Sequence, residues 1–170
     1  MKLRWTRFQI LSLASALGAF ALVVAGGFVT QTNSGLGCPD WPLCGGSIVP
    51  DWGNPTMVTE WTHRTVAAVV GILVLLTTIL AWRDRRDDRR IVFVATMSLV
   101  LVAIQATLGG AVVLSELNAG LIVVHLAFAA AFFAMAVATA ILAFVLPPLR
   151  PAETVEAPER AGVAEEKTQA

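Results

Sequence analysis

The chain has 170 residues, of which 56% are hydrophobic and 14% charged, and 12 basic side chains balance 12 acidic ones to a formal net charge of zero. This composition excludes a disordered chain and a basic nucleic-acid-binding protein, so no nucleic acid partner is expected. It is also more apolar than a small water-soluble domain, whose surface must be covered by polar groups. The expected solvent is a lipid bilayer.

Four stretches are long and apolar enough to cross a hydrocarbon core about 30 Å thick, which needs roughly 20 residues of helix. They cover residues 8–29, 66–82, 91–114 and 121–146. The second stretch is short, so residues 60–64 are expected to form its first turns, and Pro55 marks where a regular helix could not begin earlier. We therefore predict an all-α membrane protein, a four-transmembrane-helix bundle of two hairpins, with its second helix at about 57–82.

The first apolar stretch follows a basic start and contains small residues at 25–27, as a cleaved secretory signal does. Its 22 residues exceed the apolar run of about 7 to 15 that is usual in a signal. A retained first helix is therefore the preferred interpretation.

The basic residues predict the orientation of the chain. Eleven of the 12 Lys and Arg residues lie before the first helix, between the second and third helices, or in the tail, and Arg64 is the exception. Because positively charged loops stay in the cytoplasm, both termini are expected there, an N-in/C-in topology. Residues 30–56 and 115–120 then face outward. The expected location is the cell membrane, with several passes.

The chain divides into two parts. Residues 1–146 hold the four predicted helices. Residues 147–170 begin with Pro147, Pro148 and Pro151, which stop the fourth helix, and continue as an Ala- and Glu-rich segment with too little apolar surface to fold. We expect this segment to be a disordered cytoplasmic tail.

The two hairpins share a weak internal pattern. Gly26-Gly27 and Gly109-Gly110 stand near the outer ends of the first and third helices, and each pair is followed by an outer loop and a histidine. The second glycine of the pair lies 36 positions before the histidine in the first hairpin and 15 positions before it in the second. The first hairpin therefore carries 21 extra residues. The pattern fits internal duplication, although glycine pairs also simply allow membrane helices to pack closely.

The histidines His63 and His125 are candidate metal ligands. His63 lies 20 residues before Arg83 and His125 lies 22 before Pro147, so at about 1.5 Å per residue both lie near the outer edge of the hydrocarbon. Two imidazoles at one level on different hairpins can face each other across a bundle, which suits axial ligation of a haem iron. A single intramembrane histidine can also merely bond to a neighbouring helix. Zinc is less favoured, because its sites want three or four ligands.

Glu60 precedes His63 by three residues and Arg64 by four, so all three share one helical face. In one interpretation, Glu60 and Arg64 form an ion pair that anchors the helix at the interface. In the other, Glu60 acts as acid, base or carbocation stabiliser beside a haem edge, and Arg64 neutralises a haem propionate. The isolated outward position of Arg64 favours the second interpretation.

Cys38 and Cys44 lie in the predicted outer loop, where a close cysteine pair tends to oxidise. The pair is either a structural staple or a redox-active disulfide, and the sequence does not separate the two. In the third helix, the polar Gln105 either hydrogen-bonds between helices or approaches a ligand.

Three motifs together point to a family. They are Gly-Leu-Gly-Cys-Pro-Asp-Trp-Pro-Leu-Cys at 35–44, Glu-Trp-Thr-His-Arg at 60–64, and Gln-Ala-Thr-Leu-Gly-Gly at 105–110 with His125 following. The chain resembles the haem A synthase family of cytochrome oxidase assembly enzymes from about residue 7 to residue 146. The resemblance implies an oxidoreductase that converts the C8 methyl group of haem O to a formyl group, giving haem A for terminal oxidase assembly.

The resemblance also implies roles for individual residues. His63 and His125 are similar to the axial ligands of a haem iron, Glu60 to the catalytic carboxylate, and Cys38 with Cys44 to an extracytoplasmic disulfide. Arg64 joins the cofactor-binding residues, and residues 1–146 become a haem-binding domain. Haem O is the implied substrate and haem B a further cofactor. The implied partners are a second copy of this chain in a homo-oligomer, haem O synthase, a quinone or other electron acceptor, and the lipid bilayer.

The length departs from the family pattern. Common members have eight helices in two similar halves, one for the substrate and one for a haem B cofactor. This chain resembles the N-terminal, substrate-binding half, because it keeps the Cys loop and Glu60. Either a homo-oligomer supplies more than one haem site, or a single site suffices.

Two other functions compete with this one. A non-catalytic bis-histidine membrane cytochrome b would use the same histidines to relay electrons, but a pure carrier needs no carboxylate such as Glu60 near the ring. A four-helix, quinone-linked thiol oxidase would usually pass electrons between two Cys pairs, and this chain has one pair.

Overall fold

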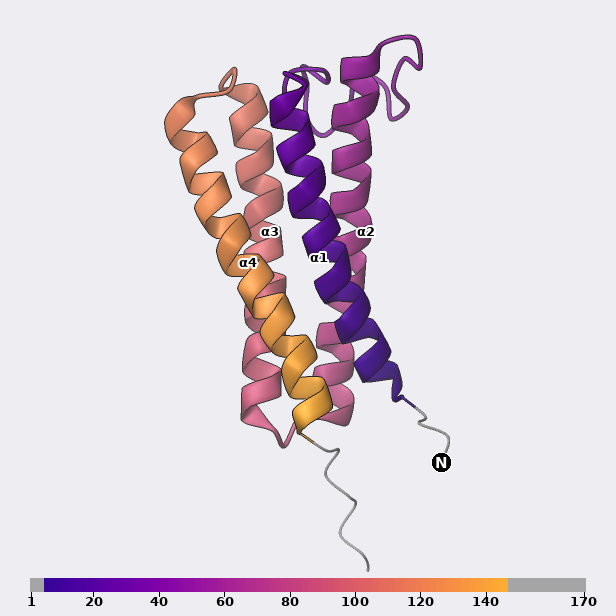
Figure 1. Ribbon diagram of the computed structural model, residues 1–170, viewed down its shortest axis with the longest axis vertical. Coiled ribbons are helices and arrows are strands. Elements are labelled where there is room, and N and C mark those ends of the chain that lie inside the picture. The colour runs from indigo at the N-terminus through magenta and orange to yellow at the C-terminus, as the bar shows by residue number, and fades with distance from the viewer. Residues whose placement is uncertain (1–4, 147–170) are drawn as a thin grey trace, which may run out of the picture.

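The computed structural model describes residues 5–146, and the predicted tail at 147–170 lies outside the described residues. The chain forms four helices in up-and-down order: α1 (Arg7–Gln31), α2 (Pro55–Asp84), α3 (Arg89–Leu114) and α4 (Ala119–Val145). Helices α1 and α3 each pack against both α2 and α4, so that α2 and α4 lie diagonally across the bundle (Figure 1). The predicted all-α, four-helix architecture is confirmed.

Polar side chains begin each helix by accepting hydrogen bonds from amides of the first turn. These N-cap residues are Thr6, Asn54, Asp88 and Asn118. Helix α2 begins at Pro55, two residues before the predicted start at 57. The reason is that the first position of a helix leaves its N–H without an intrahelical partner, so proline costs nothing there.

All four helices are long and apolar enough to cross a membrane. Large apolar side chains cover the outside of the bundle, and Phe20, Phe93 and Leu126 are each more than half exposed. In a bilayer these side chains face lipid instead of water. The chain is a multi-pass membrane protein, as predicted.

The bundle is packed tightly at one end only. Two clusters of buried apolar residues fill the half that holds the chain ends and the α2–α3 turn: Phe8, Ala81, Ile91, Ala95 and Ala143, and further in Ala19, Val70, Val74, Phe132 and Ala136. In the opposite half, no residue of α1 beyond Ala19 and no residue of α4 before Phe132 is buried. The histidines lie in this loosely packed half.

Hydroxyl groups join neighbouring helices inside the packed half. Ser15 and Thr77 lie 3.0 Å apart between α1 and α2, the Thr78 hydroxyl donates to the Ala95 carbonyl (3.0 Å) between α2 and α3, and Ser98 and Thr139 lie 3.5 Å apart between α3 and α4. They line a small cavity of about 10 Å³. Each such bond contributes about 0.6 kcal/mol within a membrane, and up to about 1.7 kcal/mol.

We predict that Thr78→Val lowers the free energy of unfolding in mixed micelles by about 1 kcal/mol, because it removes the bond to Ala95 without changing the shape of the side chain. The matched control is Thr107→Val, since Thr107 is exposed and bonds only within its own helix. Equal losses in the two variants, measured by circular dichroism during detergent unfolding, would contradict the assigned interhelical bond.

Candidate functional site

The two histidines come from the diagonal helices of the bundle. His63 on α2 and His125 on α4 are half-buried, and they lie close enough for their charges to interact. The Nδ1 atom of each ring is buried and has no hydrogen-bond partner among residues 5–146. The described chain therefore leaves one nitrogen of each imidazole unsatisfied.

Each imidazole lies against a glycine of the preceding helix. A Cβ atom placed on Gly26 would lie 3.3 Å from Cε1 of His63, and one placed on Gly109 would lie 3.5 Å from Cε1 of His125. The two hairpins thus give their histidines equivalent neighbours. This equivalence supports the internal repeat seen in the sequence, and at Gly26 a side chain would crowd the ring.

Gln105 fixes the backbone beside the second histidine. Its Nε2 atom donates to the carbonyl oxygen of His125 at 2.9 Å, which confirms the interhelical bond that the sequence offered as one alternative. The Oε1 atom of Gln105 is buried without a partner among the described residues. A second unsatisfied polar atom therefore lies near this imidazole.

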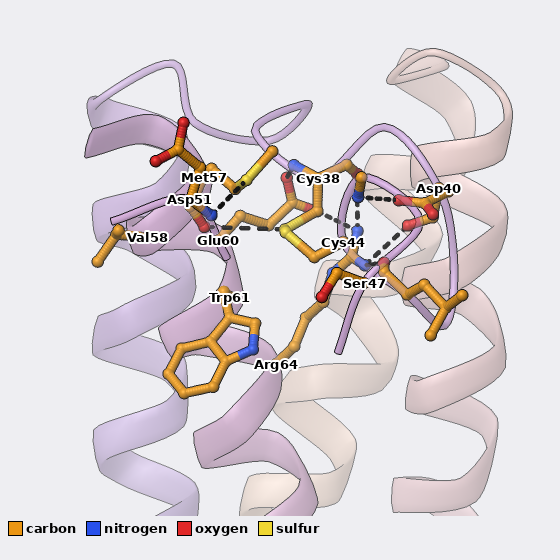
Figure 2. Close-up of a disulfide and its surroundings, with 12 residues drawn as sticks. Cys38, Asp40, Cys44, Ser47, Asp51, Met57, Val58, Glu60, Trp61 and Arg64 are labelled. Carbon is orange, nitrogen blue, oxygen red and sulfur yellow. Dashed lines mark hydrogen bonds and ion pairs between the residues drawn. A yellow bond between two sulfur atoms is a disulfide. The ribbon is translucent and has the colours of Figure 1, made fainter. Parts of the chain in front are cut away.

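Cys38 and Cys44 close a small ring in the loop between α1 and α2, which we call the Cys cap (residues 35–46; Figure 2). Their sulfur atoms are 1.94 Å apart, at disulfide distance, and both residues are buried. Burial favours the structural staple over the redox-active pair, because thiol exchange requires access to a sulfur.

The Asp40 carboxylate organises the end of the Cys cap. It accepts hydrogen bonds from the amides of Gly46 (2.7 Å) and Gly45, both of which have positive φ angles that glycine adopts without strain. These amides, Gly46 foremost, hold the pKa of Asp40 below its usual value even though partial burial acts in the opposite direction.

Glu60 and Arg64 hold the Cys cap onto α2. The amide of Cys38 donates to Oε2 of Glu60 at 2.8 Å, and one terminal nitrogen of Arg64 donates to the Cys38 carbonyl at 2.9 Å and to Oε1 of Glu60. The other terminal nitrogen of Arg64 donates to the carbonyls of Asp40 (2.8 Å) and Leu43 (2.7 Å). Figure 2 shows both side chains directed at the cap.

These bonds occupy most of the Arg64 guanidinium. It has five N–H donors, and the four contacts above leave only the Nε–H without a partner among residues 5–146. The ion pair between Arg64 and Glu60 is present, as expected if these residues anchor the helix. The same two side chains also anchor the loop. The contact of Arg64 with a haem propionate stays a prediction.

Sequence reasoning did not single out Asp40 or Trp41. A Cβ atom on Gly110 would lie 2.8 Å from Cδ2 of Trp41, so the indole ring packs directly on α3 beside Gly109. Two features of the sequence could have drawn attention to Asp40 and Trp41: both lie between the two cysteines, and the Gly45-Gly46 pair follows directly. The Cys cap consequently contacts both hairpins.

These features define a class: a four-helix membrane protein with two glycine-flanked histidines facing a loosely packed half, under a disulfide-closed cap. Residues 9–54 and 53–164 match the family described as cytochrome oxidase assembly protein, and the chain belongs to this family. The resemblance stated from the motifs is confirmed.

Curated relatives carry the name haem A synthase. The chain is 38% identical to the protein of Shouchella clausii, with 79% of this chain and 45% of the relative aligned. It is 34% identical to that of Bacillus licheniformis (79% and 44%) and 42% identical to that of Exiguobacterium sibiricum (61% and 36%). The chain thus spans less than half the length of these relatives.

We predict that Arg64→Lys loosens the Cys cap, because an ammonium group has three donors and no fork geometry with which to serve four acceptors. Hydrogen exchange of the Cys38 amide should accelerate by about tenfold or more, as expected when charge-assisted hydrogen bonds are lost. Arg89→Lys, at the exposed start of α3, is the control and should leave that exchange rate unchanged. An unaltered rate in Arg64→Lys would contradict the contacts assigned to Arg64.

The lowered pKa of Asp40 predicts how the Cys cap responds to acid. The folded cap binds fewer protons than the open loop, so the contribution of Asp40 is fully present above its ordinary value of 3.8 and is lost as the pH falls through the lower, folded value. An NMR titration of the Asp40 carboxyl carbon in micelles should give a midpoint below 3.8. Asp40→Asn should remove the acid-dependent increase in loop proteolysis, and a midpoint at or above the ordinary value would disprove the assignment.

Proposed function

We propose that this chain is a haem A synthase that oxidises the C8 methyl group of haem O to a formyl group and so supplies haem A for terminal oxidase assembly. The observation that carries the proposal is the pair of glycine-flanked histidines on α2 and α4, whose Nδ1 atoms have no partner among residues 5–146, with the buried Glu60 one turn before His63 on α2. The relatives named haem A synthase support the same function.

The residues present fit a haem. Two imidazoles lie on diagonal helices, and each ring has a glycine, without a side chain, beside it. The half of the bundle that holds the histidines has no buried side chains on α1 beyond Ala19 or on α4 before Phe132, so a large planar group displaces no core there. We propose that His63 and His125 hold the iron of the haem substrate, which fixes the porphyrin ring for reaction at its edge.

Glu60 is the proposed catalytic carboxylate. Converting a methyl group to a formyl group takes one oxygen atom from water and releases four electrons and four protons, so a group that accepts protons or stabilises positive charge at the methyl carbon is needed. Both oxygens of Glu60 are held, one by Cys38 and one by Arg64. This fixed position is what preorganised electrostatic stabilisation requires. The electrons pass to a quinone or another acceptor.

We propose an N-in/C-in orientation with the Cys cap outside. Six of the seven Lys and Arg residues in the described part of the chain lie at the bundle end opposite the cap. Arg64 is the exception, and its charge is bonded to Glu60 and to loop carbonyls. Residues 1–146 are the haem-binding domain of this proposal, and residues 147–170 are its cytoplasmic tail.

We also propose that the chain works as a homo-oligomer. A second copy would supply a second histidine pair for haem B. Haem O synthase is the proposed source of substrate. The alternative, a cytochrome b that only relays electrons, is not favoured, because the curated relatives carry the name haem A synthase.

The proposal predicts separable effects of variants. Protein purified from cells that make haem O should show a bis-imidazole spectrum, and extraction should yield haem A or its hydroxylated intermediate. Glu60→Gln should keep bound haem but reduce conversion by about 100-fold or more, the range of general acid–base catalysis. His63→Ala and His125→Ala should lose haem. Glu116→Gln, which changes an exposed acid in the other loop, is the control.

Two results would contradict these roles. Conversion by Glu60→Gln at the wild-type rate would remove Glu60 from the chemistry, and full haem content in either histidine variant would refute the ligand assignment. Wild-type protein that binds haem but converts none of it would instead identify the electron-carrying cytochrome.

A further inference from the structure

A groove of about 410 Å³ lies between α1 and α2 at the end of the bundle farthest from the Cys cap. Arg7, the first residue of α1, and Arg83, near the end of α2, supply its polar lining. The rest of the lining is Ile10 and Leu11 from α1, and Leu76, Ile79 and Leu80 from α2. In Figure 1 these two helix ends lie at the bottom of the bundle, where the chain enters α1.

Helical spacing joins each arginine to an apolar stripe. Ile10 and Leu11 follow Arg7 by three and four residues, and Ile79 and Leu76 precede Arg83 by four and seven. Residues at these intervals share one helix face, so both stripes run from the guanidinium toward the middle of the membrane. The groove is therefore cationic at the membrane surface and apolar along its length.

The guanidinium groups of Arg7 and Arg83 have no ion pair or hydrogen bond with another residue in the range 5–146, in contrast to that of Arg64, which is bonded to Glu60. Two positive charges lining one groove repel each other. An anion placed between them would remove this repulsion, and an apolar chain attached to that anion would fill the remainder of the groove.

We propose that this groove is a binding site for an anionic phospholipid of the adjoining leaflet. The lipid phosphate lies between the guanidinium groups of Arg7 and Arg83, and one acyl chain lies along Ile10, Ile79 and Leu80. Basic pockets between membrane helices bind anionic headgroups for the same electrostatic reason. A second copy of the chain fits less well, since a two-fold contact through this face would bring four arginines together.

The site is tested by titrating purified protein in detergent with phosphatidylglycerol and with phosphatidylcholine of the same acyl chains, and counting bound lipid by native mass spectrometry. Wild-type protein should bind phosphatidylglycerol more tightly. Arg7→Gln/Arg83→Gln should weaken that binding by roughly 10- to 30-fold, since each Arg near an anionic headgroup strengthens binding by a similar factor and two are removed. The matched control, Arg89→Gln/Arg90→Gln, removes two exposed charges from the same end of the bundle and should bind as the wild type does.

A further variant and a soluble probe separate the acyl contribution from the charge. Ile79→Trp keeps both arginines but fills the groove, and it should also weaken phosphatidylglycerol binding. Inorganic phosphate should fail to displace the lipid at equal concentration. Circular dichroism of each variant in lipid-free detergent checks that the helices are intact.

Any of four results would overturn the site. These are equal affinity for the two lipids, an equal loss in the Arg89/Arg90 control, displacement by inorganic phosphate alone, and a change of oligomeric mass in Arg7→Gln/Arg83→Gln without loss of lipid. The haem experiments do not depend on this groove, which lies at the other end of the bundle, so the two proposals fail independently.

Discussion

The hydrogen bonds of the Arg64 guanidinium are the interaction on which the Cys-cap end of the bundle depends. A cation near the membrane surface is costly unless it is satisfied, and here one carboxylate and three backbone carbonyls satisfy it. The same bonds determine where the Cys cap lies, since the cap has a single short β-bridge, Cys44 with Ser47, among the described residues. The position of Trp41 over α3, and the fixed orientation of Glu60, both follow from this anchoring.

Packing in the bundle is divided between its two ends. Small side chains such as Ala19, Ala81 and Ala143 bring the helices together in one half, and hydroxyl pairs between helices add directional bonds there. The other half keeps two imidazoles and two glycines and almost no buried apolar side chain. A protein that must admit a large planar molecule needs one rigid end and one end that is not filled by its own side chains.

Much of the fold could be predicted from the sequence, because a bilayer requires long apolar helices and because basic residues mark the turn between α2 and α3. The start of α2 was placed two residues late, since Asn54 as an N-cap makes Pro55 a favourable first residue. Helical rise predicted similar levels for the two histidines, and the structure brings them close enough for their charges to interact. The contacts of Arg64 with Cys38 and Leu43 could not be predicted, because they join residues more than 20 positions apart through an irregular loop. The packing of Trp41 on Gly110 could not be predicted for the same reason.

The Cys cap has one further consequence. The two hairpins offer their histidines in equivalent surroundings, with Gly26 beside one and Gly109 beside the other, and a ring held only by such a pair would have no preferred rotation about the iron. The extra loop residues are present in the first hairpin alone, and with Glu60 and Arg64 they make one side of the site chemically different from the other. If the proposed function is right, this broken symmetry would give a bound porphyrin a distinguishable edge, which an enzyme needs in order to oxidise one of several similar methyl groups and leave the others intact.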